Sequence, residues 1–230
     1  MLYSYQQEIK IFESQQRKDF RMNYLLAMPT DLQEGERLPM IVSLHGAGER
    51  GWDAPLLKLN GVPKYLDEGL PVRAIVLAPQ VPSWDLIWNT IVHELMELVV
   101  LIRDSYPVDE DRVSVTGLSM GGYGTWELAM SYTSAFSALA PFCGGGTSFR
   151  AWRLKDLPIR ACHGDADDTV PLSATMEMVD AVRAAGGEPE CLIRHGVGHD
   201  CWHWVYEQTN LIEWLVAQKR SAKPVEQISY

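Results

Sequence analysis

Residues 111–129 read DRVSVTGLSMGGYGTWELA, and this stretch decides the fold. Its first part, Arg112–Thr116, predicts a strand, and the residues after the turn predict a helix over Gly122–Tyr132. Between them, Gly117-Leu118-Ser119-Met120-Gly121 matches G-x-S-x-G, the sharp strand-to-helix turn that exposes a nucleophilic serine. Glycines beside the serine leave the room that such a turn needs.

Outward from this turn, short apolar runs alternate with segments of helical period. Strands are predicted at Glu8–Glu13, Arg21–Met28, Pro39–Leu44, Val72–Ala78, Phe136–Phe142, Pro158–Cys162 and Glu190–Arg194, and helices at Ile91–Ser105, Leu172–Ala185 and His203–Gln218. The first two strands are expected to be antiparallel, and the βαβ alternation after them predicts a mainly parallel sheet. We therefore expect one α/β domain over residues 1–230, with about eight strands, helices on both faces and no large cap domain.

Composition narrows the class of function. The 230 residues are 47% hydrophobic and carry a formal net charge of −10, which disfavours nucleic-acid binding. The first residues lack the pattern of a signal peptide, and no apolar run is long enough to span a membrane. The four cysteines, Cys143, Cys162, Cys191 and Cys201, form no metal or disulfide pattern and are expected to be reduced thiols of a cytoplasmic protein, although Cys191 pairing with Cys201 stays open.

Two later segments complete the chain order Ser, Asp, His that this turn is expected to use. The segment His163-Gly-Asp165-Ala-Asp167-Asp168-Thr-Val-Pro171 follows one predicted strand, and His195-Gly-Val-Gly-His199 follows the next. A serine hydroxyl needs a base to take its proton, and His199 is the candidate, oriented by an aspartate between residues 165 and 168. Ser119, His199 and one of these aspartates are the predicted catalytic residues.

The loop after the Pro39–Leu44 strand, His45-Gly-Ala47-Gly-Glu-Arg-Gly51, is the predicted source of an oxyanion donor. The backbone N–H of Ala47 would face that of Met120 across the nascent oxyanion. His45 is expected to brace this loop through hydrogen bonds and not to transfer protons. Trp84, Trp88 and Trp202 lie in loops near the predicted site and are candidates for a substrate pocket, with surface packing as the alternative.

The chain contains four motifs in the order LHGAGERG, DRVSVTGLSMGGYGTWELA, HGDADDTVP and GVGHDCW. Together they resemble the phospholipase/carboxylesterase family of α/β hydrolases. That family is related to acyl-protein thioesterases and to bacterial serine esterases described as peptidase-like or feruloyl-esterase-like. The resemblance covers about residues 39–219. It implies an α/β-hydrolase fold and ester hydrolysis without a cofactor or metal. By motif, it implies that Ser119 is the nucleophile, His199 the base and Asp167 the acid. Asp168 and Asp165 remain alternative acids, because the segment has three aspartates.

Three other classes of function are compatible with single features. Gly46–Gly51 formally matches the GxGxxG of NAD-binding oxidoreductases, with Asp67 or Glu68 at the distance of a ribose contact, but Pro55 interrupts the helix that should follow. The four-residue spacing of His195, His199 and His203 suggests zinc, but glycines separate the first two histidines. The last alternative is a non-catalytic binding protein on a hydrolase scaffold.

The prediction is thus a serine carboxylesterase that hydrolyses an ester of a small or medium acyl or aryl group through an acyl-enzyme. A peptidase or a thioesterase would use the same three residues. The expected partner is a small-molecule ester, and a homodimer is compatible with the sequence.

Overall fold

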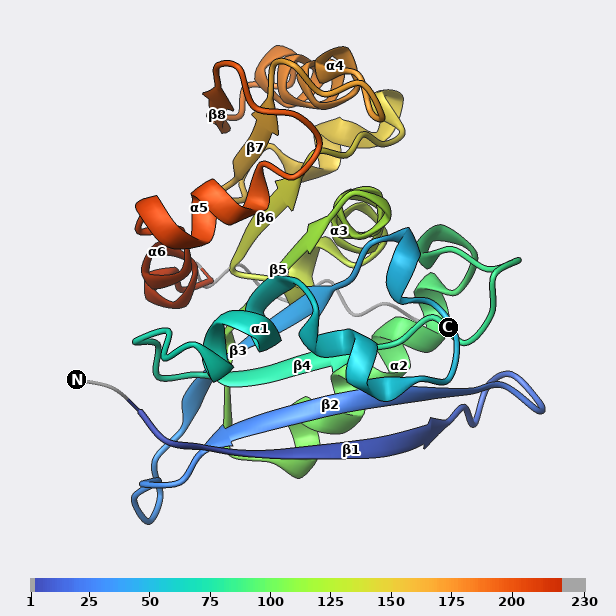
Figure 1. Cartoon of the computed structure of the whole chain (residues 1–230), viewed down its shortest axis with the longest axis vertical. Helices are drawn as coiled ribbons and strands as arrows, with labels where there is room; N and C mark the ends of the chain where they lie inside the picture. Colours follow the sequence, from blue (N-terminus) through green and yellow to red (C-terminus); the bar gives the residue numbers. More distant parts are fainter. Residues whose placement is uncertain (1–2, 221–230) are drawn as a thin grey trace.

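A computed structural model describes residues 3–220 and contains one eight-stranded sheet in the order β1-β2-β4-β3-β5-β6-β7-β8 (Figure 1). The strands are β1 (Tyr5–Glu13), β2 (Arg21–Pro29), β3 (Leu38–Leu44), β4 (Ile75–Pro79), β5 (Val108–Leu118), β6 (Ala138–Phe142), β7 (Arg160–Gly164) and β8 (Glu190–Arg194). Strand β2 pairs antiparallel with both of its neighbours, β1 and β4, and the pairs among β4, β3 and β5 to β8 are parallel. The predicted mostly parallel sheet of about eight strands is confirmed.

Helices cover both faces of the sheet (Figure 1). They are α1 (Gly61–Asp67), α2 (Val92–Ser105), α3 (Met120–Ser131), α4 (Leu172–Ala184), α5 (Trp202–Gln208) and α6 (Leu211–Ala217). Successive residues of a strand point to opposite faces, so Met40 and Val42 pack with α2 and α3 whereas Ile41 packs with α1, α5 and α6. Each face thus buries its own apolar core, and the loops at the carboxyl ends of the strands are left for function.

The single helix predicted over His203–Gln218 is wrong, because the structure has two helices there. The hydroxyl of Thr209 donates to the carbonyl of Val205 (2.7 Å) and accepts from the N–H of Leu211 (3.2 Å). This side chain thus bonds to the last turn of α5 and to the first residue of α6, in competition with the backbone bonds of a continuous helix. Within residues 3–220, no helix has both the length and the apolar composition that crossing a bilayer would require.

Candidate active site

Ser119 occupies the turn between the end of β5 and the start of α3. Its backbone has φ 55° and ψ −118°, a conformation that costs energy in any residue other than glycine and that is often found at functional sites. The neighbours must be small: a Cβ on Gly121 would lie 2.1 Å from the carbonyl oxygen of Leu44, and one on Gly117 would lie 2.4 Å from that of Gly121. The two glycines therefore let the strained turn form against β3.

Hydrogen bonds link Ser119 to His199 and His199 to Asp167. The Ser119 hydroxyl lies 2.8 Å from Nε2 of His199, and Nδ1 of His199 lies 2.7 Å from Oδ2 of Asp167. The imidazole is 21% exposed, whereas the carboxylate is fully buried. With Nδ1–H donating to the carboxylate, Nε2 is free to accept the serine proton. The structure thus brings together the three residues that the sequence motifs singled out.

The ionised form of Asp167 is favoured despite its burial. Burial by itself would raise the pKa of Asp167, but hydrogen bonds from His199 and from the backbone N–H groups of Val170 and Thr169 outweigh it and lower the pKa below 3.8. The two backbone donors reach Oδ1 at 2.8 and 2.9 Å. Because Oδ1 is held by the backbone, Oδ2 is directed at the histidine.

The other two aspartates of the segment point elsewhere. The exposed side chain of Asp168 accepts a hydrogen bond from the hydroxyl of Thr169 (3.3 Å). Asp165 contacts Nδ1 of His195 (2.6 Å) and accepts from the N–H of Gly196 (2.7 Å). Neither of these carboxylates contacts His199, so the geometry favours Asp167 among the three.

The loops after β7 and β8 lie against each other and set the distance between acid and base. The N–H of Ala166 donates to the carbonyl of Val197 (3.0 Å). A Cβ on Gly164 would lie 2.2 Å from that same carbonyl oxygen, so only glycine permits this approach. Both loops start at neighbouring parallel strands, which explains why residues 32 positions apart meet here.

The two predicted oxyanion donors lie at the starts of helical turns. Met120 is the first residue of α3, and Ala47 is the first residue of a 3-10 helix over Ala47–Glu49. The first N–H groups of a helix have no carbonyl partner within it, so they are available to an anion. His45 holds the loop as expected: Nε2 accepts from the N–H of Val81 (2.9 Å), and Nδ1 donates to the carbonyl of Gly46 (2.6 Å).

Protonation of His45 should destabilise the fold as the pH falls. Burial lowers the pKa of His45 from 6.5 to about 4. Between these values the unfolded chain binds a proton that the folded chain does not, so the free energy of unfolding should fall by about 3 kcal/mol from pH 6.5 to pH 4. Urea unfolding of the wild type and of His45→Gln at several pH values measures this contribution. The variant should lack this part of the pH dependence. If the free energy of unfolding changed equally with pH in the two proteins, the prediction would be contradicted.

The three candidate pocket tryptophans have different surroundings. Trp88 is 1% exposed and donates from Nε1 to the carbonyl of His45 (3.0 Å), so it lies in the core beneath the loop and not at the surface. Trp84 is 64% exposed, and the guanidinium of Arg50 lies over its ring at 4.4 Å. Trp202 stands edge-on to the ring of His199, with 5.6 Å between the centroids.

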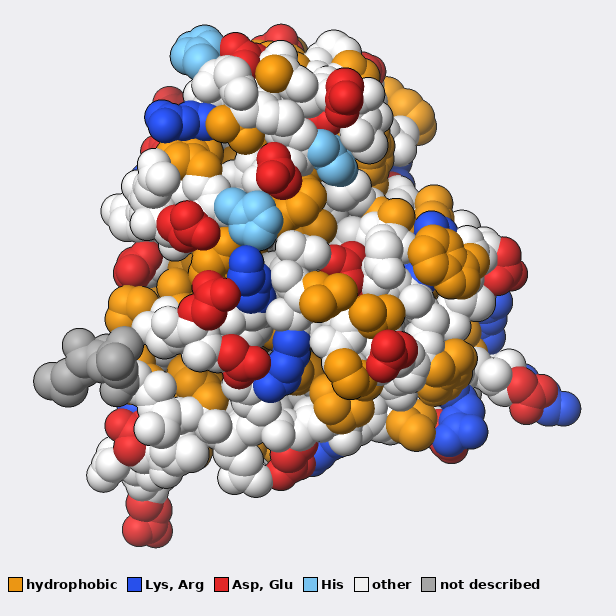
Figure 2. Space-filling model, in the orientation of Figure 1, with side chains coloured by type: hydrophobic (Ala, Val, Ile, Leu, Met, Phe, Trp, Pro, Cys, Tyr) orange, Lys and Arg blue, Asp and Glu red, His pale blue; other side chains and the backbone are white. Residues whose placement is uncertain are grey.

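Hydrophobic side chains gather on the surface around the loops that follow β3 and β4, on the right of Figure 2. The exposed apolar side chains of these loops are Trp52, Leu59, Trp84 and Ile87. Exposed apolar side chains of this kind can contact the apolar part of a ligand.

A partly buried chain of polar contacts connects the loop after β3 to Trp202, and it includes residues to which the sequence assigned no role. Asn60 donates to Oε1 of Glu49 (2.7 Å) and accepts from Nε1 of Trp202 (3.2 Å). The Glu49 side chain is only 7% exposed. An acidic residue within a glycine-rich loop is the one sequence signal that could have drawn attention to this chain of contacts.

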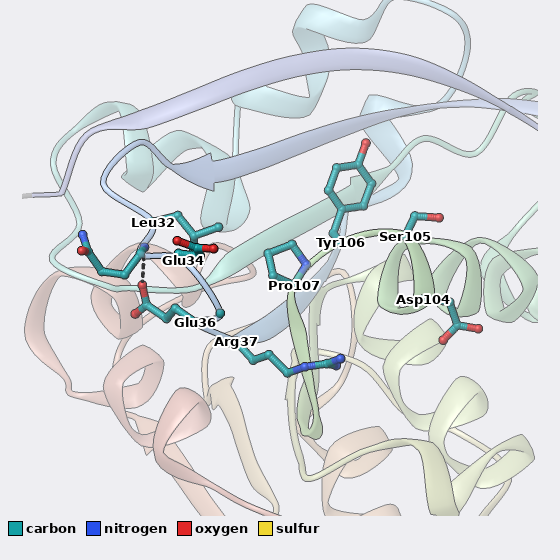
Figure 3. A pocket seen from close by; sticks show the side chains of 10 residues that line it. Leu32, Glu34, Glu36, Arg37, Asp104, Ser105, Tyr106 and Pro107 are labelled. Atoms are coloured by element: carbon teal, nitrogen blue, oxygen red, sulfur yellow. Dashed lines mark hydrogen bonds between the residues drawn. The ribbon is translucent and has the colours of Figure 1, made fainter.

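An open depression of about 640 Å³ lies elsewhere, between the segments 32–37 and 104–107 (Figure 3). These segments directly precede β3 and β5, whereas Ser119 follows β5. The depression is therefore at the opposite end of the strands and takes no part in the site.

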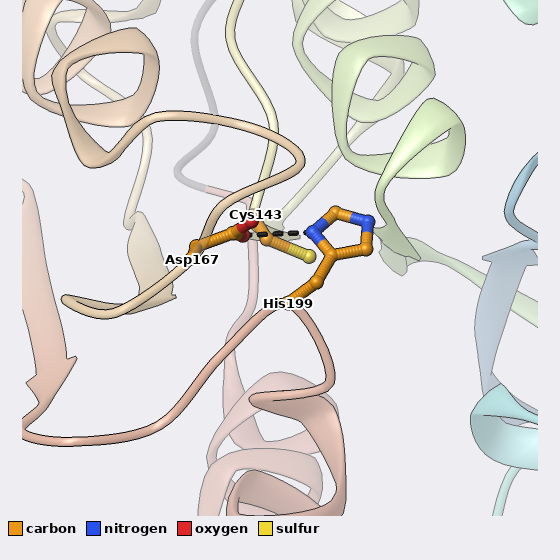
Figure 4. Close-up of side chains that lie close together, drawn as sticks. All are labelled: Cys143, Asp167 and His199. Atoms are coloured by element: carbon orange, nitrogen blue, oxygen red, sulfur yellow. Dashed lines mark hydrogen bonds and ion pairs between the residues drawn. The ribbon is translucent and has the colours of Figure 1, made fainter.

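The three histidines considered for zinc are not gathered into one cluster within residues 3–220. His195 is paired with Asp165, and Nδ1 of His203 lies 2.9 Å from the hydroxyl of Tyr65. The group that does come together is Cys143, Asp167 and His199, with ligand atoms within 4.8 Å of one another (Figure 4). A hydrogen bond with Cys201 and burial raise the pKa of the Cys143 thiol, so the thiolate that metals prefer is disfavoured.

The remaining alternatives find little structural support. The glycine-rich loop after β3 leads into a three-residue 3-10 helix and not into the long helix that a dinucleotide-binding turn requires. All four cysteines are free, and the thiol of Cys191 contacts Met176 (3.8 Å) instead of Cys201.

Comparisons with known proteins identify a family and several relatives. A family model described as "Putative esterase" matches residues 16–223. The S-formylglutathione hydrolase of Paracoccus denitrificans (strain Pd 1222) is 34% identical over 65 residues, 28% of this chain and 22% of that protein. The bifunctional acetylxylan esterase/xylanase XynS20E of Neocallimastix patriciarum is 27% identical over 135 residues, 57% of this chain and 20% of that protein. The chain thus spans about a fifth of the length of these two relatives.

A solved structure described as a thermostable esterase has the same arrangement of strands and helices. It superposes with a TM-score of 0.82 at 30% identity, over 93% of this chain and 63% of that one. The family model, which extends over most of the chain, and this structural similarity together identify the fold as that of the α/β hydrolases. The chain belongs to the esterase family.

Proposed function

We propose that the protein is a serine carboxylesterase in which Ser119 is the nucleophile, His199 the general base and Asp167 the residue that orients the base. The observation that carries this proposal is the hydrogen-bonded path from the Ser119 hydroxyl through His199 to Asp167, with distances of 2.8 and 2.7 Å. Each residue of the path follows a parallel strand, β5, β7 or β8, at its carboxyl end.

In the proposed reaction, the Ser119 oxygen attacks the ester carbonyl while Nε2 of His199 takes the hydroxyl proton. Asp167 accepts from Nδ1–H and stabilises the imidazolium that forms. The N–H groups of Met120 and Ala47 stabilise the oxyanion, and one such donor contributes about 3 kcal/mol to transition-state stabilisation. His199 then protonates the leaving alcohol, and water releases the acid from the acyl-enzyme by the same steps.

The acyl group is proposed to be small. The relatives support this choice, because one is an S-formylglutathione hydrolase and the other a bifunctional acetylxylan esterase/xylanase. In the structure, Trp202 flanks the base, and Trp84 is exposed on the loop after β4. We propose that Trp202 lines the acyl side of the site and that Trp84 contacts the more distant part of an ester.

A substrate panel tests the proposal directly. We expect p-nitrophenyl esters of two to four carbons to be hydrolysed with a higher kcat/KM than those of eight to twelve carbons, and both faster than a peptide p-nitroanilide. Methyl ferulate reports whether an aryl acyl group is accepted. Turnover restricted to the peptide amide would contradict the proposed activity.

Thioester hydrolysis is the second candidate, since the relative from Paracoccus denitrificans is named for a substrate with its formyl group on sulfur. A thiolate leaves more readily than an alkoxide, so the same three residues can serve both reactions. S-formylglutathione and S-acetylglutathione added to the panel compare the two activities, and a kcat/KM that is higher for the thioesters by more than tenfold would favour this candidate.

A further inference from the structure

Strand β1 forms one edge of the sheet and lies along the lower border of Figure 1. It is nine residues long and pairs with β2 in an unbroken register. Within residues 3–220, no strand pairs with its other side. Proteins often protect such an edge by keeping the strand short or by placing a proline or a bulge in it, and β1 has none of these features. This edge is therefore open to pairing with another strand.

The backbone groups of β1 that point outward belong to its odd-numbered residues. In an antiparallel pair, residues alternate between those that bond to the partner strand and those that point away from it. At one end of the pair, the carbonyl of Ser4 accepts from the N–H of Thr30 (2.9 Å). At the other end, the N–H of Ser14 donates to the carbonyl of Phe20 (3.0 Å). Even-numbered residues thus bond to β2, and the outward groups are those of Tyr5, Gln7, Ile9, Ile11 and Glu13.

We propose that two copies of the chain associate through β1, antiparallel about a two-fold axis at Ile9, and so join their sheets into one. A two-fold axis brings the same surface of both copies together. In an antiparallel pair, outward-pointing residues must meet outward-pointing residues, and this register satisfies that condition because odd-numbered residues meet odd-numbered ones. It pairs all nine residues of each strand and forms about ten backbone hydrogen bonds. One of these replaces a weak contact of the Glu13 carbonyl with the exposed Gln15 side chain (3.4 Å).

The charges of β1 favour this register over its neighbours. With Ile9 opposite Ile9 of the partner subunit, Glu8 lies opposite Lys10 of the partner subunit, and the reverse pair forms on the other side of the axis. A shift by two residues would place Glu8 opposite the partner's Glu8, or Lys10 opposite the partner's Lys10, and like charges directly opposite each other are destabilising. Within one chain, Glu8 already contacts Lys10 (2.9 Å), so the axis joins two ion pairs into one network.

Two isoleucines on the other face of β1 add apolar contact. Ile9 is 48% exposed and Ile11 is 52% exposed, and side chains two positions apart in a strand share one face. Around the axis, Ile9 meets its counterpart, and Ile11 lies diagonal to Ile9 of the partner subunit, within reach of its side chain. The four isoleucines would shield one another from water, which gives a reason for apolar residues on an edge strand.

The proposed interface lies away from the proposed active site. Strands β2, β4 and β3 separate β1 from β5, which leads into Ser119. Each subunit therefore keeps its own site, and dissociation of the dimer should leave kcat unchanged. The inference is independent of the proposed function, because it is tested by mass and not by turnover.

Reversal of the charges tests the register. Glu8→Lys alone places lysines opposite lysines across the axis, and Lys10→Glu alone places glutamates opposite glutamates, so each variant should be monomeric at concentrations where the wild type is a dimer. An equimolar mixture of the two variants restores opposite charges and should form a heterodimer. Sedimentation velocity of the 230-residue chain, from nanomolar to tens of micromolar, compares the mass with the 25.9 kDa of one subunit. A wild type that stays monomeric, or a mixture that stays monomeric while the wild type dimerises, would overturn the proposal.

Ile9→Pro tests the edge hydrogen bonds. The N–H of residue 9 points outward, so proline there removes a donor to the partner and none from the ladder with β2. The dissociation constant of the dimer should rise by more than about tenfold. The control is Ile193→Lys on β8, the opposite edge of the sheet, where Ile193 is 37% exposed, and it should leave the dimer intact. Dissociation by Ile193→Lys but not by Ile9→Pro would overturn the proposal. If circular dichroism shows that Ile9→Pro does not fold, the charge variants decide.

Discussion

Replacing Ser119 with alanine should lower kcat for a p-nitrophenyl ester by a factor on the order of 10⁵ to 10⁶, because no acyl-enzyme can form without the hydroxyl. Binding should change little, since the methyl group of alanine fits wherever serine fits. Initial rates at saturating substrate measure kcat. The protein must be highly purified, because traces of wild-type enzyme would otherwise determine the lowest rate that can be measured.

The matched control is Ser148→Ala, which removes a serine hydroxyl from a surface contact with Glu177 (2.6 Å) and should retain full kcat. A fluorophosphonate probe should label the wild type and Ser148→Ala at Ser119 and leave Ser119→Ala unlabelled. Near-wild-type turnover in Ser119→Ala, with unchanged unfolding, would refute the mechanism.

Asp167→Asn should lower kcat by about 10⁴ near neutral pH. The backbone donors of Thr169 and Val170 keep the amide oxygen on their side, so the amide nitrogen faces His199. Nδ1 must then accept, the proton moves to Nε2, and His199 can no longer take the proton of Ser119. Steady-state kinetics at pH 7 measures the loss.

The other aspartates of the segment provide the controls for this variant. Asp168→Asn changes an exposed contact with Thr169 and should keep kcat within about twofold, since surface changes of this kind have small effects. Asp165→Asn should behave similarly, because its partner His195 is itself 89% exposed. A large loss of kcat in Asp168→Asn, together with a near-normal kcat in Asp167→Asn, would identify Asp168 as the acid instead.

The elements of the fold were predictable where the local pattern was strong. The run of apolar residues from Pro39 to Leu44 predicted β3 within one residue, and β8 was predicted with its observed bounds. Helix α1 was missed because Gly61 and Pro63 are poor helix formers; proline is tolerated in the first turn, and packing of Val62 and Tyr65 against the sheet stabilises the short helix.

The order of the motifs along the chain was enough to predict part of the candidate site. The turn at Ser119 and the order of the later segments identified His199, but three aspartates within four positions could be separated only by where the backbone directs each side chain. Burial of Trp88 and the contact of Asn60 with Trp202 depend on partners many residues away. Their positions in the sequence carry no pattern that predicts such contacts.

The pairing of β6 with β7 has a consequence for how the site is held together. These strands share one register pair, Phe142 with Cys162, and one isolated bridge, whereas β7 and β8 pair along their whole length. Ser119 stands on one side of this narrow seam, and Asp167 and His199 stand on the other. A slight opening of the seam would separate proton donor from acceptor while each half of the sheet stayed intact, so loss of activity should precede global unfolding.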